Sequence, residues 1–155
     1  MAIQTGYFPN INSQADDFFR SHFIATIASV DLAGIPNQAV IYYGFAPDTP
    51  DIYFLTRTDS RKIYQLKQNP HISFLVTEIS QMQTYEIFGG SQILSDRDQI
   101  DTWIKILVSR VKHSPDPRWL PVLQLPHSGL SVVKIKPDQW IWSEFTADSE
   151  LNDSV

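Results

Sequence analysis

The sequence predicts a mainly β fold, an antiparallel barrel of six to seven short strands with helices at its periphery. The first observation is a succession of short runs rich in β-branched and aromatic residues, each bounded by proline, glycine or polar clusters. The second is that these runs do not alternate with helices, as the βαβ units of a parallel sheet would. The third is Gly89-Gly90 inside a strand pattern, which is typical of a bulge or a sharp bend.

Length and composition place the chain among globular domains. Its 155 residues are 43% hydrophobic and 19% charged, which allows a real core and argues against extensive disorder. Residues 1–155 are therefore predicted to form a single domain, with a lead-in over 1–12 and a frayed acidic tail from about 146. The absence of cysteine excludes a disulfide framework and a thiolate metal site.

Charge and hydropathy restrict the expected partners and the expected compartment. The net charge of −5 argues against broad binding to nucleic acid or to anionic membranes. Residues 1–12 lack the basic and then apolar order of a signal peptide. The longest apolar run, Phe23–Val30, is too short to span a bilayer. We expect a cytoplasmic protein with neither a nucleic acid nor a membrane as partner.

The elements are expected to follow one another with short polar connections. In chain order they are an irregular lead-in over 1–12, a helix over 13–22, strands over 23–30, 37–45 and 52–56, a helix over 61–68, strands over 71–77 and 84–94, a helix over 96–112, and strands over 130–135 and 140–142. Ser13 is a plausible cap of the first helix, whose first turn is acidic. Asp31–Gly34 supplies a hairpin turn in which Gly34 suits a left-handed position.

The later elements carry their own start and stop signals. Ser95 with Asp98 resembles a capping box, and the apolar residues that follow repeat with the helical period up to Lys112. His113–His127 contains four prolines and is predicted to be a long loop. Lys136–Asp138 is predicted to be a turn between the last two strands.

The stretch 51–70 predicts a strand, a polar turn and a short helix. Ser60 suits the N-cap, and Asn69-Pro70 ends the helix because the residue before proline is disfavoured in the helical conformation. Arg61 and Lys62 fall in the first helical turn, where the helix dipole disfavours positive charge. An anion held by these two cations and the helix N-terminus would remove the conflict. The stretch therefore predicts a phosphate site.

The order of elements and this motif resemble the pyridoxamine 5′-phosphate oxidase family and its flavin-binding split-barrel relatives. The resemblance covers roughly residues 18–142, and the residues that carry it are Phe54-Leu55-Thr56, Ser60-Arg61-Lys62, Gln65-Leu66, Asn69-Pro70 and Ile72–Val76. It implies a split β-barrel that binds FMN at the subunit interface of a homodimer.

Carried over to matching positions, the resemblance implies a cofactor site on three strands and one helix. The implied contacts are Arg61 and Lys62 to the phosphate, Ser60 adding a hydroxyl, Leu55 and Thr56 along the flavin, Ile41 against the flavin ring through its backbone, Tyr43 at a substrate-facing position, and Gln83, which is adjacent to Thr84, where relatives have a flavin-contacting glutamine. No catalytic acid or base can be named. The four histidines show no metal-ligand spacing, so no metal site is expected.

The chain departs from the true oxidases of this family at the groups that grip the substrate. It has Gln38 where they have a basic residue and Tyr43 where they have a lysine. Their Tyr/Arg/Ser set has no counterpart in the helix over 96–112, and their Arg-Leu-His signature is absent after Trp142. Pyridoxamine 5′-phosphate is therefore not the expected substrate.

The expected function is that of an FMN-dependent oxidoreductase acting on a small molecule that the sequence does not define. In such a protein the flavin carries the redox chemistry, and the chain supplies orientation and access. Three alternatives keep the same barrel. In the first, the cofactor is deazaflavin F420 or haem instead of FMN. In the second, the protein binds flavin without turnover, as a storage or stress-associated protein. In the third, an empty barrel acts as a dimeric interaction module.

Overall fold

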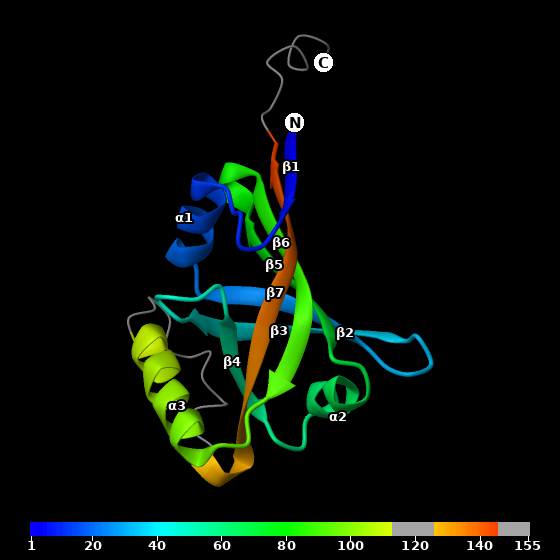
Figure 1. Cartoon of the computed structure of the whole chain (residues 1–155), viewed down its shortest axis with the longest axis vertical. Helices are drawn as coiled ribbons and strands as arrows, with labels where there is room; N and C mark the ends of the chain where they lie inside the picture. The colour runs from blue at the N-terminus through cyan, green and yellow to red at the C-terminus, as the bar shows by residue number, and fades with distance from the viewer. Residues whose placement is uncertain (113–125, 146–155) are drawn as a thin grey trace.

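The computed structural model describes residues 1–112 and 126–145. The elements, shown in Figure 1, are β1 (Ala2–Tyr7), α1 (Ser13–Ser21), β2 (Ile24–Val30), β3 (Pro36–Phe45), β4 (Ile52–Arg57), α2 (Arg61–Gln68), β5 (His71–Glu78), the 3₁₀ turn η1 (Ile79–Gln81), β6 (Gln83–Ile93), α3 (Arg97–Lys112), the 3₁₀ turn η4 (His127–Gly129) and β7 (Leu130–Glu144). The mainly β class with peripheral helices is confirmed.

All seven strands belong to one antiparallel sheet with the order β1-β7-β4-β3-β2-β5-β6. A further pairing between β7 and β6 joins the two sides of the sheet, so six strands close into a barrel. β1 lies outside this closed ring and, among the described strands, pairs only with β7. The predicted antiparallel split barrel is confirmed. The seventh strand, β1, is not part of the closed barrel.

β7 is a single long strand, and the predicted turn at Lys136–Asp138 is wrong. Residues 130–135 pair with β4, residues 139–144 pair with β1, and β6 runs along the other edge. The chain absorbs Pro137 through a bulge instead of a turn. Pro137 pairs with Gly89, Gln139 pairs with Phe88, and Asp138 is the extra residue.

The bulge depends on close approach between two backbones. A Cβ atom at Gly89 would collide with the carbonyl oxygen of Lys136, whereas a Cβ at Gly90 would meet nothing within 4 Å. Glycine is therefore required at the first of the two positions and tolerated at the second. The bulge predicted from Gly89-Gly90 is confirmed, and it bends the β6–β7 ladder where the barrel closes.

β1 replaces the irregular lead-in expected over residues 1–12. Its side chains are almost all exposed, so no pattern of buried apolar residues reveals the strand. Backbone pairing with the far end of β7 forms it instead. The segment that follows is tied down as well, because Trp140 Nε1 donates a hydrogen bond to the Asn10 carbonyl oxygen at 2.9 Å.

At α1 and α3 the capping residue lies one position away from the predicted cap. Asn12, not Ser13, caps α1 by accepting a hydrogen bond from the Ala15 amide at 3.1 Å. At α3, Asp96 accepts from the Gln99 amide at 2.9 Å, a role expected of Ser95. Asn and Asp are strong N-caps, and in each case the residue beside the expected cap performs the same task.

Two apolar clusters hold the barrel and its helices together. The larger fills the barrel and extends to α1 and α2; its most buried members include Ile27, Ile41, Tyr43, Phe54, Phe74, Tyr85, Ile135 and Trp142. The smaller lies between α3 and the outer side of β4 and β7, where the ring of Tyr53 stacks on Trp103 with 3.5 Å between the ring centroids. α1 therefore closes one end of the barrel, and α3 covers one side of it (Figure 1).

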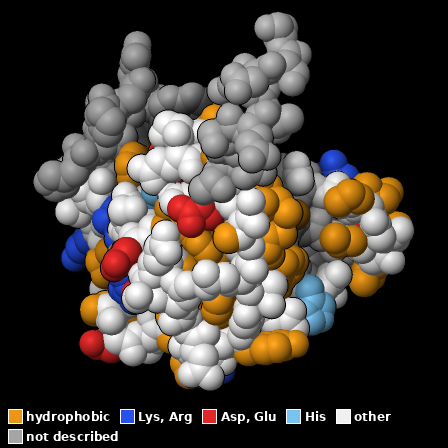
Figure 2. Space-filling view, turned by 90° about the horizontal axis from the view of Figure 1, so that it is seen from above, with side chains coloured by type: hydrophobic (Ala, Val, Ile, Leu, Met, Phe, Trp, Pro, Cys, Tyr) orange, Lys and Arg blue, Asp and Glu red, His pale blue; other side chains and the backbone are white. Residues whose placement is uncertain are grey.

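The surface is mixed in polarity. Seen from above, most of the visible charged side chains lie on one side, and hydrophobic side chains gather near the centre and on the other side (Figure 2). Among the described helices, none is both long enough and apolar enough to cross a membrane.

The loop predicted over 113–127 lies outside the described residues except for its end, where His127 begins η4. The acidic tail from 146 lies outside them too.

Candidate functional site

The turn between β4 and α2 presents a cluster of hydrogen-bond donors. Thr56 is buried near the end of β4, and its hydroxyl accepts a hydrogen bond from Lys62 Nζ at 3.2 Å. The same hydroxyl donates to Ser60 Oγ, also at 3.2 Å. Because Ser60 accepts in this pair, its own hydroxyl hydrogen remains available to a ligand. Lys62 keeps further N–H groups for the same purpose.

The first turn of α2 adds backbone donors to this cluster. Ser60 occupies the N-cap position with an extended backbone, but its side chain does not bond to the helix. The first intrahelical hydrogen bond runs from the Tyr64 amide to the Ser60 carbonyl oxygen at 3.3 Å. The amides of residues 61–63 therefore lack intrahelical acceptors, as at any helix start. No acidic residue in the first turn offsets the positive end of the helix dipole.

Two cations stand at this donor-rich end. Lys62 is half-buried, and that burial lowers the pKa of its ammonium group. Arg61 is exposed and finds no hydrogen-bond or ion-pair partner among the described residues. The acid closest in sequence, Asp59, is already paired with Arg57 through an Nη2–Oδ2 contact of 2.6 Å. Positive charge at Arg61 and Lys62 is thus left for an external anion.

Buried contacts hold the cluster in place. Ile63 and Leu66 seat α2 in the core, and Gln65 Oε1 accepts a hydrogen bond from Ser29 Oγ of β2 at 2.8 Å. On the other side of the turn, the hydroxyls of Thr58 and Ser131 lie 3.0 Å apart. The contact with Ser131 could not be predicted from the sequence, since β7 is far away along the chain. The donors are therefore carried on a turn fixed at both sides.

The donor set fits a phosphate group. A phosphate dianion needs cations and hydrogen-bond donors together, and a guanidinium can donate to two of its oxygens at once. Arg61, Lys62, Ser60 and the α2 amides supply those groups within one helical turn. These residues can therefore form the phosphate site predicted from residues 51–70 without a rearrangement of the fold.

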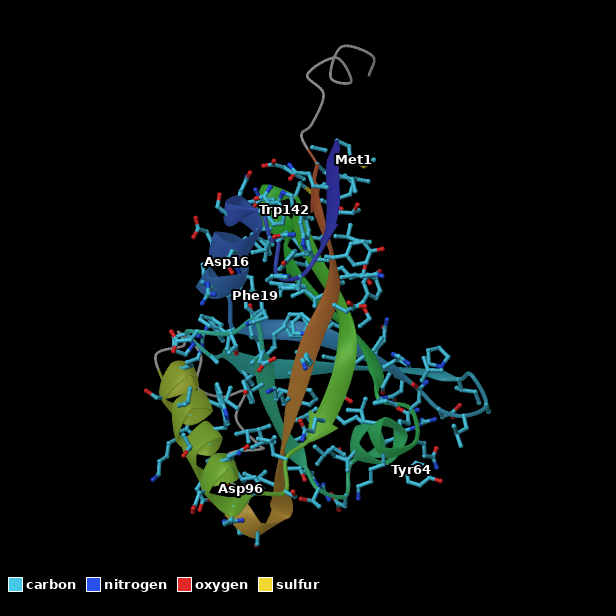
Figure 3. All side chains as sticks on the ribbon, viewed as in Figure 1. Met1, Asp16, Phe19, Tyr64, Asp96 and Trp142 are labelled. Carbon is cyan, nitrogen blue, oxygen red and sulfur yellow. The ribbon has the colours of Figure 1, made fainter. Side chains whose placement is uncertain are left out.

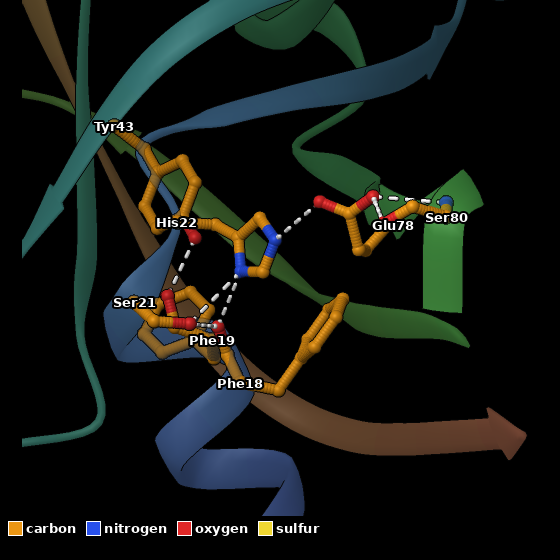
Figure 4. Close-up of polar contacts among 7 residues, drawn as sticks. All are labelled: Phe18, Phe19, Ser21, His22, Tyr43, Glu78 and Ser80. Carbon is orange, nitrogen blue, oxygen red and sulfur yellow. Dashed lines mark hydrogen bonds and ion pairs between the residues drawn. The ribbon is translucent and has the colours of Figure 1, made fainter. Parts of the chain in front are cut away.

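Leu55, Ile41 and Tyr43 do not direct their side chains toward this cluster. Leu55 packs into the smaller apolar cluster beneath α3, and Ile41 lies in the barrel core. Tyr43 is 1% exposed, and its hydroxyl donates to the Phe19 carbonyl oxygen at 2.6 Å (Figure 4). Burial raises the pKa of Tyr43, so this donor stays protonated. The side chain of Tyr43 thus cannot face a substrate outside the barrel, whereas backbone contacts from Leu55 and Ile41 stay predictions.

Gln83 lies far from the cluster within one chain. Its Nε2 donates to Glu144 Oε1 at 2.9 Å, and it pairs with Glu78 at the far end of the β5–β6 ladder. The end of this ladder next to α2 is where His71 pairs with Gly90. Seven residues of strand separate the two ends, or about 23 Å. The chain by itself therefore does not bring Gln83 to Lys62.

His22 has a structural place in the described part of the chain (Figure 4). Its Nδ1 lies 2.7 Å from the Phe18 carbonyl oxygen, and its Nε2 lies 3.6 Å from the Glu78 carboxylate. The imidazole therefore links the end of α1 to the end of β5. Ser21, beside it, donates its hydroxyl to the same Phe18 carbonyl oxygen at 2.8 Å.

No group of three or more His, Asp or Glu side chains in the described ranges could hold a metal ion.

Comparison with known proteins agrees with this architecture. Residues 11–141 match the family model described as pyridoxamine 5′-phosphate oxidase. No curated protein matches the sequence at a significant level.

Solved structures share the fold at low identity. A conserved hypothetical protein of Mycobacterium tuberculosis has a TM-score of 0.70 and 16% identity, over 91% of this chain and 94% of that one. An FAD-binding protein of Mesorhizobium loti has a TM-score of 0.67 and 15% identity, over 93% and 100%. HupZ of Group A Streptococcus has a TM-score of 0.66 and 16% identity, over 90% and 99%. The family model covers most of the chain, and the chain belongs to the pyridoxamine 5′-phosphate oxidase family.

Proposed function

We propose that this protein binds FMN and acts as an oxidoreductase on a small molecule. The observation that carries the proposal is the cluster of Thr56, Ser60, Arg61 and Lys62 at the start of α2. A terminal phosphate dianion matches this cluster in charge and in its need for donors. Membership of a family named for an oxidase supports the redox assignment.

A terminal phosphate is favoured over a pyrophosphate. The cluster is built on a single helical turn, and the chain has no glycine-rich dinucleotide fingerprint. One structural neighbour is described as FAD-binding, so FAD belongs among the outcomes of the test. F420 and haem belong there as well, because the barrel alone does not select the cofactor.

The chain's own residues would bind and orient the cofactor. Lys62 offsets the phosphate charge, and the Thr56 hydroxyl fixes the position of its ammonium group. The pair Ser29–Gln65 keeps α2 seated on β2, so the donors are already in place before a ligand arrives. Bound flavin would supply hydride and electron transfer, chemistry that amino-acid side chains lack.

The released chromophore decides which cofactor the protein carries. The purified protein is denatured, and the supernatant is analysed by visible spectrum and mass. FMN is the expected result. Recovery of FAD, F420 or haem in its place would contradict the FMN assignment and leave the anion site standing.

Turnover is tested separately on the flavin-loaded protein. Reduced nicotinamide cofactors are added without oxygen, and loss of the oxidised flavin absorbance is followed over time. Reduction followed by reoxidation with an added acceptor is expected of an oxidoreductase. A flavin that no donor reduces would instead identify a binding protein without turnover.

We also propose a homodimer with the flavin at the subunit interface. Val40 on β3 and Ile24 on β2 are 62% and 41% exposed, so apolar surface lies open on two neighbouring strands. A contact from Gln83 to the cofactor requires a second copy, because Gln83 is remote from Lys62 within one chain. Sedimentation should show a dimer, and Val40→Lys should weaken it. A stable monomer that retains flavin would contradict the dimer.

The proposed compartment is the cytoplasm.

A further inference from the structure

Ser131 of β7 is a buried polar residue beside the phosphate cluster. It is 7% exposed, and the alternate residues that follow it on β7, Val133 and Ile135, lie in the barrel core. In the β4–β7 ladder Ser131 pairs with Thr56, so the two side chains lie on the same face of the sheet. Burying a hydroxyl is unfavourable unless it is hydrogen-bonded, whereas an apolar side chain would be buried at no such cost. The Ser131 hydroxyl therefore needs a polar partner.

That partner is Thr58, in the turn between β4 and α2. The two hydroxyl oxygens lie 3.0 Å apart. The Thr58 amide also donates a hydrogen bond to the Gly129 carbonyl oxygen at 3.0 Å. Thr58 itself is exposed, so these contacts do not serve to bury its side chain. They hold the turn, at two points, to the segment 129–131 that leads into β7.

The turn over residues 57–60 has few other contacts that could fix it. None of its four residues is buried, and the ion pair between Arg57 and Asp59 joins two members of the turn to each other. The Ser60 amide donates to the Arg57 carbonyl oxygen at 3.1 Å, which is again a contact within the turn. Besides the ladder contact of Arg57 and the Thr56–Ser60 hydrogen bond, the described hydrogen bonds from this turn to the barrel are those of Thr58.

We propose that Ser131 is a positioning residue of the phosphate cluster and strengthens its preference for a ligand that carries a phosphate. Acting through Thr58, it fixes the turn that presents the Ser60 hydroxyl and the α2 amides, so these donors are in place before a ligand arrives. A displaced turn would weaken the hydrogen bonds to a phosphate, because they depend steeply on distance and angle. Contacts to the rest of the ligand would be unaffected. This inference rests on the FMN site proposed above.

Variants of the two hydroxyl residues test this role. Ser131→Ala removes the hydroxyl on β7, and Thr58→Val removes its partner but keeps the shape of the side chain. Thr58→Ser keeps the hydroxyl and is the conservative variant. Ser21→Ala is the control, because it removes a serine hydrogen bond at the end of α1, to the Phe18 carbonyl oxygen. Figure 3 shows α1, with Asp16 and Phe19, on the opposite side of the molecule from Tyr64 of α2.

The measured quantity is the ratio of two affinities. FMN and riboflavin are titrated into the flavin-free full chain and into each variant, and urea unfolding confirms that each is folded. The preference for FMN should fall about three- to tenfold in Ser131→Ala and in Thr58→Val, which is the effect of one hydrogen bond. The double variant should lose no more than either single variant, because both changes break the same contact. Thr58→Ser and Ser21→Ala should keep the wild-type ratio.

Several results would overturn the inference. One is a wild-type ratio in Ser131→Ala or in Thr58→Val, and another is an equal fall in Ser21→Ala or in Thr58→Ser. Losses that multiply in the double variant would show that Ser131 does not act through Thr58. A wild type that binds riboflavin as tightly as FMN would contradict the phosphate site itself, and this inference with it, so the two failures can be told apart.

Discussion

Lys62 Nζ donates a hydrogen bond to Thr56 Oγ1 across 3.2 Å, and this contact joins the first turn of α2 to the end of β4. The ammonium group is held half-buried at the positive end of a helix dipole, and both conditions disfavour its charge. Burial accordingly lowers its pKa. A bound phosphate would offset both costs, and this supports the ligand site proposed for the start of α2.

The first prediction concerns the pH dependence of FMN binding. Lys62 attracts the phosphate only when protonated, and its pKa in the free protein lies below the usual 10.5. FMN affinity should therefore fall as pH rises through this lowered pKa, starting below pH 10.5. In Lys62→Arg the charge persists across that range, so the fall should disappear. Fluorescence titration at several pH values measures it; identical pH profiles for the two proteins would count against a phosphate contact from Lys62.

The stability of the flavin-free protein should respond to the same group with the opposite trend. Because the folded-state pKa of Lys62 is lowered, the unfolded chain binds more protons between that pKa and 10.5. The contribution of Lys62 to stability therefore rises with pH across this window. Urea unfolding of the wild type and of Lys62→Met, compared at two pH values in the window, isolates this contribution. A contribution that falls with pH would contradict the burial of the ammonium group.

The third prediction contrasts two adjacent glycines in β6. Gly89→Ala would force a Cβ against the Lys136 carbonyl oxygen and should cost about 2–3 kcal/mol of unfolding free energy. Gly90→Ala meets nothing within 4 Å and should change it by less than about 1 kcal/mol. Urea denaturation of both variants provides the comparison. Equal effects would mean that the bulge is not where β6 and β7 approach most closely.

The fourth prediction contrasts two buried tyrosines in the ligand-free protein. Tyr43→Phe leaves the Phe19 carbonyl oxygen without its donor and should cost about 1–3 kcal/mol. Tyr85→Phe removes a hydroxyl that has no partner in the described part of the chain, so stability should stay level or rise by about 1 kcal/mol. Thermal unfolding monitored by circular dichroism compares the two. A larger loss in Tyr85→Phe than in Tyr43→Phe would show that the Tyr85 hydroxyl is satisfied in solution.

The sequence revealed the strand-turn-helix around Lys62 because its signals are local. A β-branched run, a cap residue and Asn69-Pro70 are all read within twenty residues, and the bounds of α2 follow from them. The Gly89 bulge was also readable, since paired glycines in a strand have few other uses. Local chemistry therefore predicted both the candidate site and the bend that helps close the barrel.

The remaining features depend on contacts between residues that are far apart in the sequence, so they could not be predicted from it. β1 has no buried face, so only its pairing with β7 creates it. Pro137 suggested a turn because its partner Gly89 is distant in sequence. The orientation of Tyr43 depends on strand register, and one residue decides whether a side chain faces the barrel interior or its surface. The support that Ser29 and Ser131 give to the site was invisible for the same reason.

The comparison of FMN with riboflavin tests the phosphate site most directly, because the two ligands differ only in the phosphate. Each is titrated into flavin-free wild type, into Arg61→Ala/Lys62→Ala, and into Lys67→Ala, which removes an exposed cation from the last turn of the same helix. Wild type and Lys67→Ala should prefer FMN by about a hundredfold or more, and the double variant should lose most of that preference. An FMN preference that survives in the double variant would contradict the assignment of Arg61 and Lys62.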